Sequence, residues 1–260
     1  MRTLLFGVVV FVLVLAGCSD NSSDAMPDAA AVPADMVAVP AGNFQMGCNA
    51  AVDNECYPDE SPYHEVYLDA YSIDKHEVTA GEYKTCVDAG TCAYNGGTDS
   101  YATYNNGMDE HPINYVNWSE AKTYCEWQGK RLPTEAEWEK ASRGTDGRKY
   151  PWGNESATCS YAVMAGCAGD TQPVGSMPAG ASPYGAMDMS GNVWEWTNDW
   201  YGEVYYSVSP SSNPQGPASG EYRVIRGGSF DYDAGGLRSS HRVDFTPSYR
   251  FNNFGFRCAQ

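Results

Sequence analysis

A tryptophan-rich segment constrains the fold more than any other part of this sequence. Residues 185–200 read GAMDMSGNVWEWTNDW and hold three tryptophans within seven positions. Trp194 and Trp196 alternate with Val193 and Glu195, and this period of two predicts a β-strand. Each indole ring buries roughly 150–250 Å² and needs a partner for its N–H group. We therefore expect this strand to lie in the core.

The same segment offers oxygen ligands for a metal. The turn sequence SGN precedes the strand, and Asp188 and Glu195 flank it. Two carboxylates with bent backbone between them suit Ca²⁺, which takes about 6–8 oxygen ligands. The alternative is a core strand with two solvated acids, because the spacing does not follow the EF-hand loop. The residues alone leave both interpretations open.

The N-terminus reads as an export signal. Arg2 precedes an apolar stretch, residues 4–15, that is short for a membrane span. It ends in LAGC, which resembles the bacterial lipobox, so residues 1–17 are predicted to be a signal peptide and Cys18 a lipidated N-terminus. The alternative is an ordinary signal peptide. Ser19 favours an outer-membrane lipoprotein, periplasmic or surface-exposed, with the membrane as a partner through Cys18.

Composition then separates a tether from a folded domain. Residues 18–35 are rich in Ser, Asp, Ala and Pro and lack apolar periodicity, so they predict a flexible tether before a domain at 36–260. The formal net charge of the 260 residues is −17. That charge excludes nucleic acid as a partner, because phosphate binding needs a basic surface. We attribute the acidic excess to solubility.

Eight cysteines remain once Cys18 is set aside, which indicates disulfides in an exported chain. About 105 pairings are possible in principle. Spacing favours three local pairs and leaves one long-range pair, giving Cys48–Cys56, Cys86–Cys92, Cys159–Cys167 and Cys125–Cys258. Zinc is the rival interpretation, but the chain has no C-x-x-C pair and its four histidines are scattered.

Regular structure is expected to be sparse, in an α+β arrangement. Capping boxes predict three short helices, which begin after Thr79, Asn117 and Thr134. The first should run to about Val87 and the second should close at Gly129. Short strands are predicted at 36–46, 65–71, 193–197, 222–226 and 254–258. Residues 144–260 otherwise read as loop, which needs pinning by disulfides, ions and buried tryptophans.

Taken together, these segments resemble the formylglycine-generating enzyme (sulfatase-modifying factor) family. The carrying stretches are MVAVPAGNFQMG (36–47), YSIDKHEVTAGEY (71–83), HPINYVNWSEAKTYCEWQGKRLPTEAEWEKASRG (111–144), YPWGN (150–154), PVGSMPAG (173–180), YGAMDMSGNVWEWTNDWY (184–201), RVIRGGSF (223–230) and NNFGFRCA (252–259). The resemblance implies a compact variant of the C-type lectin fold, and its long-range disulfide matches Cys125 with Cys258.

The resemblance also implies a Ca²⁺ site. Its ligands fall on the side chains of Asp188 and Glu195 and on the carbonyls of Gly191 and Val193. A second family site would fall between Cys159 and Asp170. There the matching positions are Ser160, Gly166 and Ala168, without the expected Asn and Asp, so we expect one site.

The sequence departs from the family at the residues that bind its catalytic metal. Members that make formylglycine carry two cysteines after GGS(F/Y), and these bind Cu(I), a soft ion that selects soft ligands. Here the stretch after Ser229 contains no cysteine: Tyr232 stands at the first position and the second falls within residues 234–237. We therefore predict that this chain binds no copper and lacks the oxidase activity of the family.

A polar cleft remains as the candidate site. Its residues are Ser229, Asp231, Tyr232, Asp233, Arg238, His241 and Arg242. Such a loop suits a peptide, glycan or envelope-protein ligand, so the first hypothesis is a Ca²⁺-stabilised binding or scaffold module. The alternatives are a modifying enzyme of this family, with a metal at Asp231, Asp233 and His241, or a purely structural envelope lipoprotein. The alternative without a functional role is a solvated loop with one structural arginine.

Overall fold

The computed structural model describes Met1 and residues 32–260. The predicted signal peptide, the lipidation site Cys18 and most of the predicted tether lie outside the described residues. The chain divides into two units, Met1–Ala31 and Val32–Gln260. Among the described residues, no helix combines the length and apolar character that a membrane span requires.

The strands of the second unit form three small sheets. β1 (Met36–Val39) pairs antiparallel with β4 (Tyr71–Asp74), and β2 (Gly42–Met46) pairs antiparallel with β3 (His64–Leu68). The largest sheet has the order β7-β6-β5-β8, with bounds Arg242–Phe245, Arg223–Arg226, Trp194–Trp200 and Phe254–Gly255. β5 is central: it runs antiparallel to β6 and parallel to β8.

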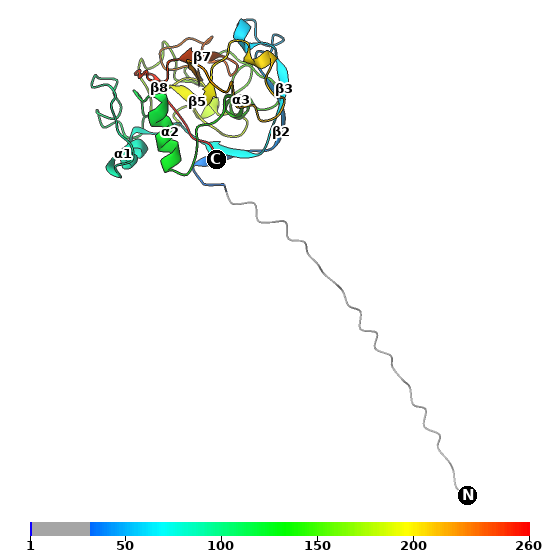
Figure 1. Cartoon of the computed structure of the whole chain (residues 1–260), viewed down its shortest axis with the longest axis horizontal. Coiled ribbons are helices and arrows are strands. Elements are labelled where there is room, and N and C mark those ends of the chain that lie inside the picture. The colour runs from blue at the N-terminus through cyan, green and yellow to red at the C-terminus, as the bar shows by residue number, and fades with distance from the viewer. Residues whose placement is uncertain (2–31) are drawn as a thin grey trace. The chain divides into compact units, whose positions relative to one another are not determined.

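Three short α-helices accompany these sheets. They are α1 (Ala80–Asp88), α2 (Trp118–Trp127) and α3 (Glu135–Arg143), and the 3₁₀ turns are Pro58–Glu60, Pro178–Gly180 and Tyr205–Ser207. Helices α1 and α2 pack together at one edge of this unit, and β2 and β3 lie at the opposite edge (Figure 1). The α+β prediction is confirmed.

The capping boxes determine where the helices begin. Thr79, Asn117 and Thr134 each accept a hydrogen bond from the N3 backbone N–H, and the N3 glutamate accepts one from the N-cap backbone. The second helix ends at Trp127, slightly before the predicted stop, and Gly129 follows with φ of 71°. A positive φ at this position is what favours glycine after a helix.

The strand predictions are confirmed in place but not in extent. β5 runs on to Trp200, whereas β8 has only two residues. The expected strand at 65–71 divides at residues 69–70 between β3 and β4. The sequence analysis missed β7, which pairs along its whole length with β6. Its sequence, RVDF, is too short to show a period, and only its neighbour in the sheet defines it.

All four disulfides form as the spacing indicated. The pairs are Cys48–Cys56, Cys86–Cys92, Cys125–Cys258 and Cys159–Cys167, with Cα–Cα distances of 5.5, 5.2, 5.6 and 5.6 Å. Cys125 and Cys258 are fully buried in the same core cluster as Trp194 and Trp196. The long-range disulfide therefore joins α2 to the C-terminus inside the core.

Candidate functional site

An open cleft lies where the loop after β6 meets two disulfide-bonded loops. It has a volume of about 370 Å³ and is lined by Tyr57, Ala165, Asp231, Tyr232, Asp233, Gly235, Gly236 and His241. Tyr57 directly follows Cys56, and Ala165 lies inside the Cys159–Cys167 loop. The Ala165 N–H donates to the Tyr232 carbonyl at 2.9 Å. Two short disulfides thus hold the rim of the cleft.

The structure brings four of the seven predicted cleft residues together. Asp231, Tyr232, Asp233 and His241 line the cleft. Ser229 lies behind it: its side chain is buried, and its hydroxyl donates to Asp231 Oδ1 at 2.7 Å. Asn253 Nδ2 donates to the same oxygen at 3.0 Å. Ser229 and Asn253 therefore orient the Asp231 carboxylate rather than face a ligand.

The two predicted arginines do not line the cleft. Both are fully buried, and the structure corrects their assignment. Arg242 makes a bidentate pair with Glu135, with both N–O distances at 2.7 Å. Arg238 contacts Glu60 at 2.6 and 2.7 Å and Asp53 at 3.0 Å. Buried guanidinium groups need such partners to offset desolvation. Arg238 and Arg242 with Glu60, Asp53 and Glu135 therefore form a buried ion-paired frame beneath the cleft.

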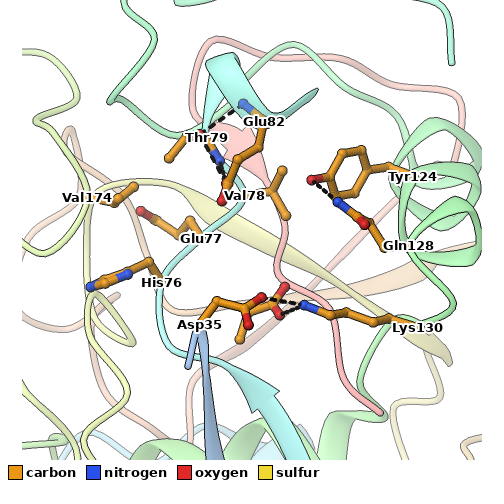
Figure 2. A pocket seen from close by; sticks show the side chains of 11 residues that line it. Asp35, His76, Glu77, Val78, Thr79, Glu82, Tyr124, Gln128, Lys130 and Val174 are labelled. Carbon is orange, nitrogen blue, oxygen red and sulfur yellow. Dashed lines mark hydrogen bonds and ion pairs between the residues drawn. The ribbon is translucent and has the colours of Figure 1, made fainter. Parts of the chain in front are cut away.

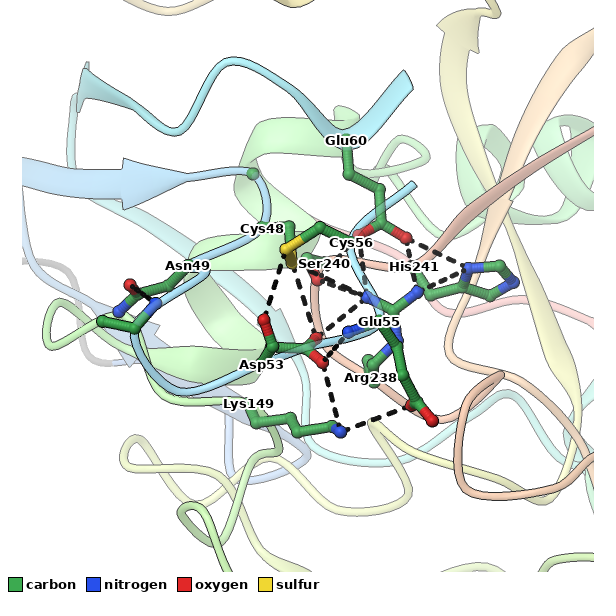
Figure 3. Close-up of a disulfide and its surroundings, with 12 residues drawn as sticks. Cys48, Asn49, Asp53, Glu55, Cys56, Glu60, Lys149, Arg238, Ser240 and His241 are labelled. Carbon is green, nitrogen blue, oxygen red and sulfur yellow. Dashed lines mark hydrogen bonds and ion pairs between the residues drawn. A yellow bond between two sulfur atoms is a disulfide. The ribbon is translucent and has the colours of Figure 1, made fainter. Parts of the chain in front are cut away.

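His241 connects that frame to the cleft (Figure 3). Its Nδ1 lies 3.3 Å from Glu60 Oε1 and 3.3 Å from an Arg238 Nη atom. Its ring is tilted against Tyr57 at 5.3 Å between centroids. Hydrogen bonds from His241 and Arg238 outweigh burial and lower the pKa of Glu60 to about 2. Glu60 therefore stays ionised beneath the cleft at neutral pH.

The structure does not gather a histidine–carboxylate metal site at the cleft. Across residues 32–260, no group of three or more His, Cys, Asp or Glu side chains is placed to hold a metal ion. The expected Ca²⁺ site differs from such a group, because backbone carbonyls supply half of its ligands.

The residues of the predicted Ca²⁺ loop lie in a buried acidic group. Asp188 Oδ2 accepts from the Gly175 N–H at 2.6 Å, and Asp188 has a positive φ of 56°. Glu195 is engaged on both oxygens by Arg257, each at 2.7 Å, and by Trp138 Nε1 at 2.8 Å. Asp188 is therefore bonded to a backbone N–H, and both oxygens of Glu195 are engaged by Arg257.

Glu77, which the sequence analysis did not single out, completes this group. It is fully buried and accepts from the Val193 N–H at 3.1 Å and from Asn192 Nδ2 at 2.6 Å. Burial and the nearby Asp188 and Glu195 raise the pKa of Glu77 well above its usual value. Three acidic side chains, Glu77, Asp188 and Glu195, thus lie near one guanidinium, that of Arg257.

A second, smaller cavity adjoins this group (Figure 2). Its volume is about 90 Å³, and Asp74, His76, Glu77 and Lys130 are among the residues that line it. Lys130 Nζ donates to Asp74 at 2.7 Å and to Asp35 at 2.9 Å. Burial lowers the pKa of His76 to about 4, so this imidazole is neutral at physiological pH. The cavity is polar, and Lys130, Asp74 and Asp35 in its lining are paired with one another.

Comparison with known proteins identifies the family. A family model described as "Sulfatase-modifying factor enzyme 1-like domain" matches residues 21–260. The chain belongs to this family. It is 32% identical over 286 residues to the formylglycine-generating enzyme of Bos taurus, covering 87% of this chain and 75% of that protein.

Two further relatives are informative. The chain is 36% identical over 249 residues to the serine/threonine-protein kinase pkn1 of Chlamydia caviae, covering 87% of this chain but only 38% of that protein. Among solved structures, PvdO from Pseudomonas aeruginosa superposes with a TM-score of 0.76 at 30% identity and covers 86% of this chain and 93% of that one. The chain therefore spans less than half of the kinase relative and nearly all of the PvdO structure.

Within this family, the cleft occupies the positions where we expected the copper-binding cysteines. Tyr232 lines the cleft, and its ring meets Trp194 edge-on at 5.0 Å between centroids. Leu237, at the end of the stretch for the second cysteine, is fully buried. All eight cysteines of the described residues are in disulfides. Residues 32–260 thus offer no thiolate to a soft metal.

Proposed function

We propose that this chain is an envelope-tethered binding or scaffold module, which uses the cleft to hold a peptide or glycan and lacks copper oxidase activity. The observation that carries the proposal is the cleft itself: it is lined by Tyr57, Tyr232, Asp233 and His241, and its rim is held by two disulfides. Aromatic and polar groups on a preformed surface suit ligand recognition.

A ligand screen tests the proposal. Peptide and glycan libraries are presented to the purified mature protein and to Tyr232→Leu, with Tyr222→Leu as the control because Tyr222 is about equally exposed. We expect ligands that bind the parent and the control but not Tyr232→Leu. Copper-dependent O₂ consumption with a cysteine peptide, or ligands that bind all three proteins equally, would contradict the proposal.

The proposed Ca²⁺ site rests on Asp188, the Gly191 and Val193 carbonyls, and the acidic group around them. An ion that binds only the folded state stabilises it by about 2.7 kcal/mol when its concentration is 100 times Kd. We expect chelation to lower the melting temperature of the parent and to have little effect on Asp188→Ala. An unchanged transition in the parent after chelation would refute the site.

The proposed anchor is Cys18. We expect mass spectrometry of protein from membranes to find Cys18 as a lipid-modified N-terminus, and Cys18→Ser to release the protein from the membrane fraction. An N-terminus at any other residue would contradict this part of the proposal.

An enzyme of altered chemistry is the second candidate. It is favoured by His241, whose Nδ1 faces the buried Glu60 while its ring lines the cleft. A group held in this way can exchange protons with a bound molecule. A metal inventory of protein purified from its host distinguishes the candidates. If no redox metal is found and alanine at Asp231, Asp233 and His241 leaves the cellular phenotype unchanged, this candidate fails.

A further inference from the structure

The rings of the cleft are arranged around an open space. Tyr57, Tyr232 and His241 line it, and the buried Trp194 holds two of them, with centroid distances of 5.0 Å to Tyr232 and 5.8 Å to His241. Tyr57 and Tyr232 keep 50% and 38% of their surface exposed. Two exposed tyrosine rings and the half-buried His241 ring thus surround one volume, and the faces of tyrosine rings carry partial negative charge.

The charges around these rings have one dominant sign. Two carboxylates, Asp231 and Asp233, line the cleft directly. Glu55 lies at its rim, since a Cβ on Gly235 would lie 3.7 Å from Glu55 Oε2. Asp233 Oδ1 accepts from the Gly235 N–H at 3.0 Å, and its other oxygen has no hydrogen-bond partner among residues 32–260. The site therefore presents acceptors to a ligand.

The basic side chains nearby are already neutralised. Arg238, whose guanidinium carbon lies 5.2 Å from the Tyr57 centroid, is bound to Glu60 and Asp53. Lys149 lies 3.2 Å from Asp53 and 3.4 Å from Glu55. The neighbourhood therefore holds two basic groups against five carboxylates, which are Asp53, Glu55, Glu60, Asp231 and Asp233. The resulting negative potential disfavours anions and attracts cations.

We propose that the cleft binds an organic ammonium ion, held over the rings of Tyr57 and Tyr232 and balanced by Asp231 and Asp233. A cation within about 6 Å of an aromatic centroid is attracted by the ring face, more strongly the further it is desolvated. This inference rests on the proposed binding function and names the chemistry of its ligand. Primary and fully alkylated amines share that chemistry.

A matched pair of probes isolates the charge. Choline and 3,3-dimethylbutan-1-ol have nearly the same shape, but only choline is charged, so calorimetric titration of the mature protein with each measures the contribution of the cation. We expect choline to bind at least about tenfold more tightly, a factor equivalent to about 1.4 kcal/mol. Butylamine in the same titration tells whether a primary amine or a fully alkylated one is preferred.

Ring and charge variants complete the test. Tyr57→Leu and Tyr232→Leu should each lower choline affinity severalfold, while Tyr57→Phe, which keeps the ring, should retain it. Asp233→Asn should weaken choline and leave the neutral alcohol unchanged. Circular dichroism confirms folding of each variant, and Tyr222→Leu serves as the exposed control.

The outcomes separate the two proposals. Equal binding of choline and its neutral isostere, or full choline affinity in both leucine variants, overturns the ammonium inference. If a neutral peptide or glycan from the library screen binds the cleft and choline does not, the ammonium inference falls and the binding function stands. If no library member and no amine binds at the cleft, both fall.

Discussion

Two groups of residues from the same short stretch behave in opposite ways. Arg238 and Arg242 are completely buried in ion pairs, whereas Tyr232 and Asp233 are exposed and His241 is half-buried at the cleft. All five lie within eleven positions of the sequence and all are polar or amphipathic. In the frame beneath the cleft, the polar groups pair with one another. In the cleft, the polar groups remain open to a ligand.

The comparison teaches that charge alone does not mark a binding residue in this protein. A buried ion pair contributes little net stability, because desolvation offsets attraction, but removing one partner strands the other charge. Removing an exposed carboxylate leaves no buried charge without a partner. Substitutions in the frame should therefore change folding, and substitutions in the cleft should change binding.

The largest effect should come from the long-range disulfide. Replacing Cys125 and Cys258 by serine opens a loop with a separation of 133 residues, and the chain-entropy model gives a loss of about 5 kcal/mol. Replacing Cys48 and Cys56, with a separation of 8, should cost about 2.5 kcal/mol. Urea unfolding measures both. If the Cys48–Cys56 replacement costs as much as the Cys125–Cys258 replacement, loop length does not determine the contribution of these disulfides.

Next in size is the loss of a frame arginine. Arg242→Met leaves Glu135 buried without its bidentate partner, and we expect a loss of about 3–5 kcal/mol in the free energy of unfolding. Arg250→Met is the matched control, because it breaks a more exposed pair with Glu120 whose contribution should be below about 1 kcal/mol. Similar losses in the two variants would show that burial does not govern these pairs.

A smaller effect should appear on acidification. The pKa of Glu60 falls from 4.5 to about 2 on folding, so its contribution to stability is fully present above pH 4.5 and is lost as pH falls towards 2. Glu60→Gln should therefore lose less stability than the parent between pH 5 and pH 3, in urea unfolding at each pH. Parallel losses in the two proteins would contradict the assigned role of Glu60.

The smallest effect on folding should come from the cleft. Asp233→Asn and Tyr57→Phe alter exposed side chains, so we expect the free energy of unfolding to change by no more than about 0.5 kcal/mol. A loss comparable with that of Arg242→Met would mean that the cleft residues belong to the frame.

Local signals in the sequence determined a substantial part of this structure. The three helix starts follow from Thr79, Asn117 and Thr134, because a capping box acts within four residues. The core strand follows from the alternation around Trp194, and the local disulfides follow from close spacing. Four of the seven predicted cleft residues do meet, because all but Ser229 and the two arginines lie at the surface of one loop.

Only the tertiary structure decided which charges are free. Arg238 is paired with Glu60, 178 positions away, and Arg242 with Glu135, 107 positions away. No local sequence pattern predicts such pairs. β7 likewise forms only because β6 lies beside it. A charged side chain reads the same in the sequence whether it is buried or exposed. Its role depends on desolvation and on partners that only the folded chain brings within reach.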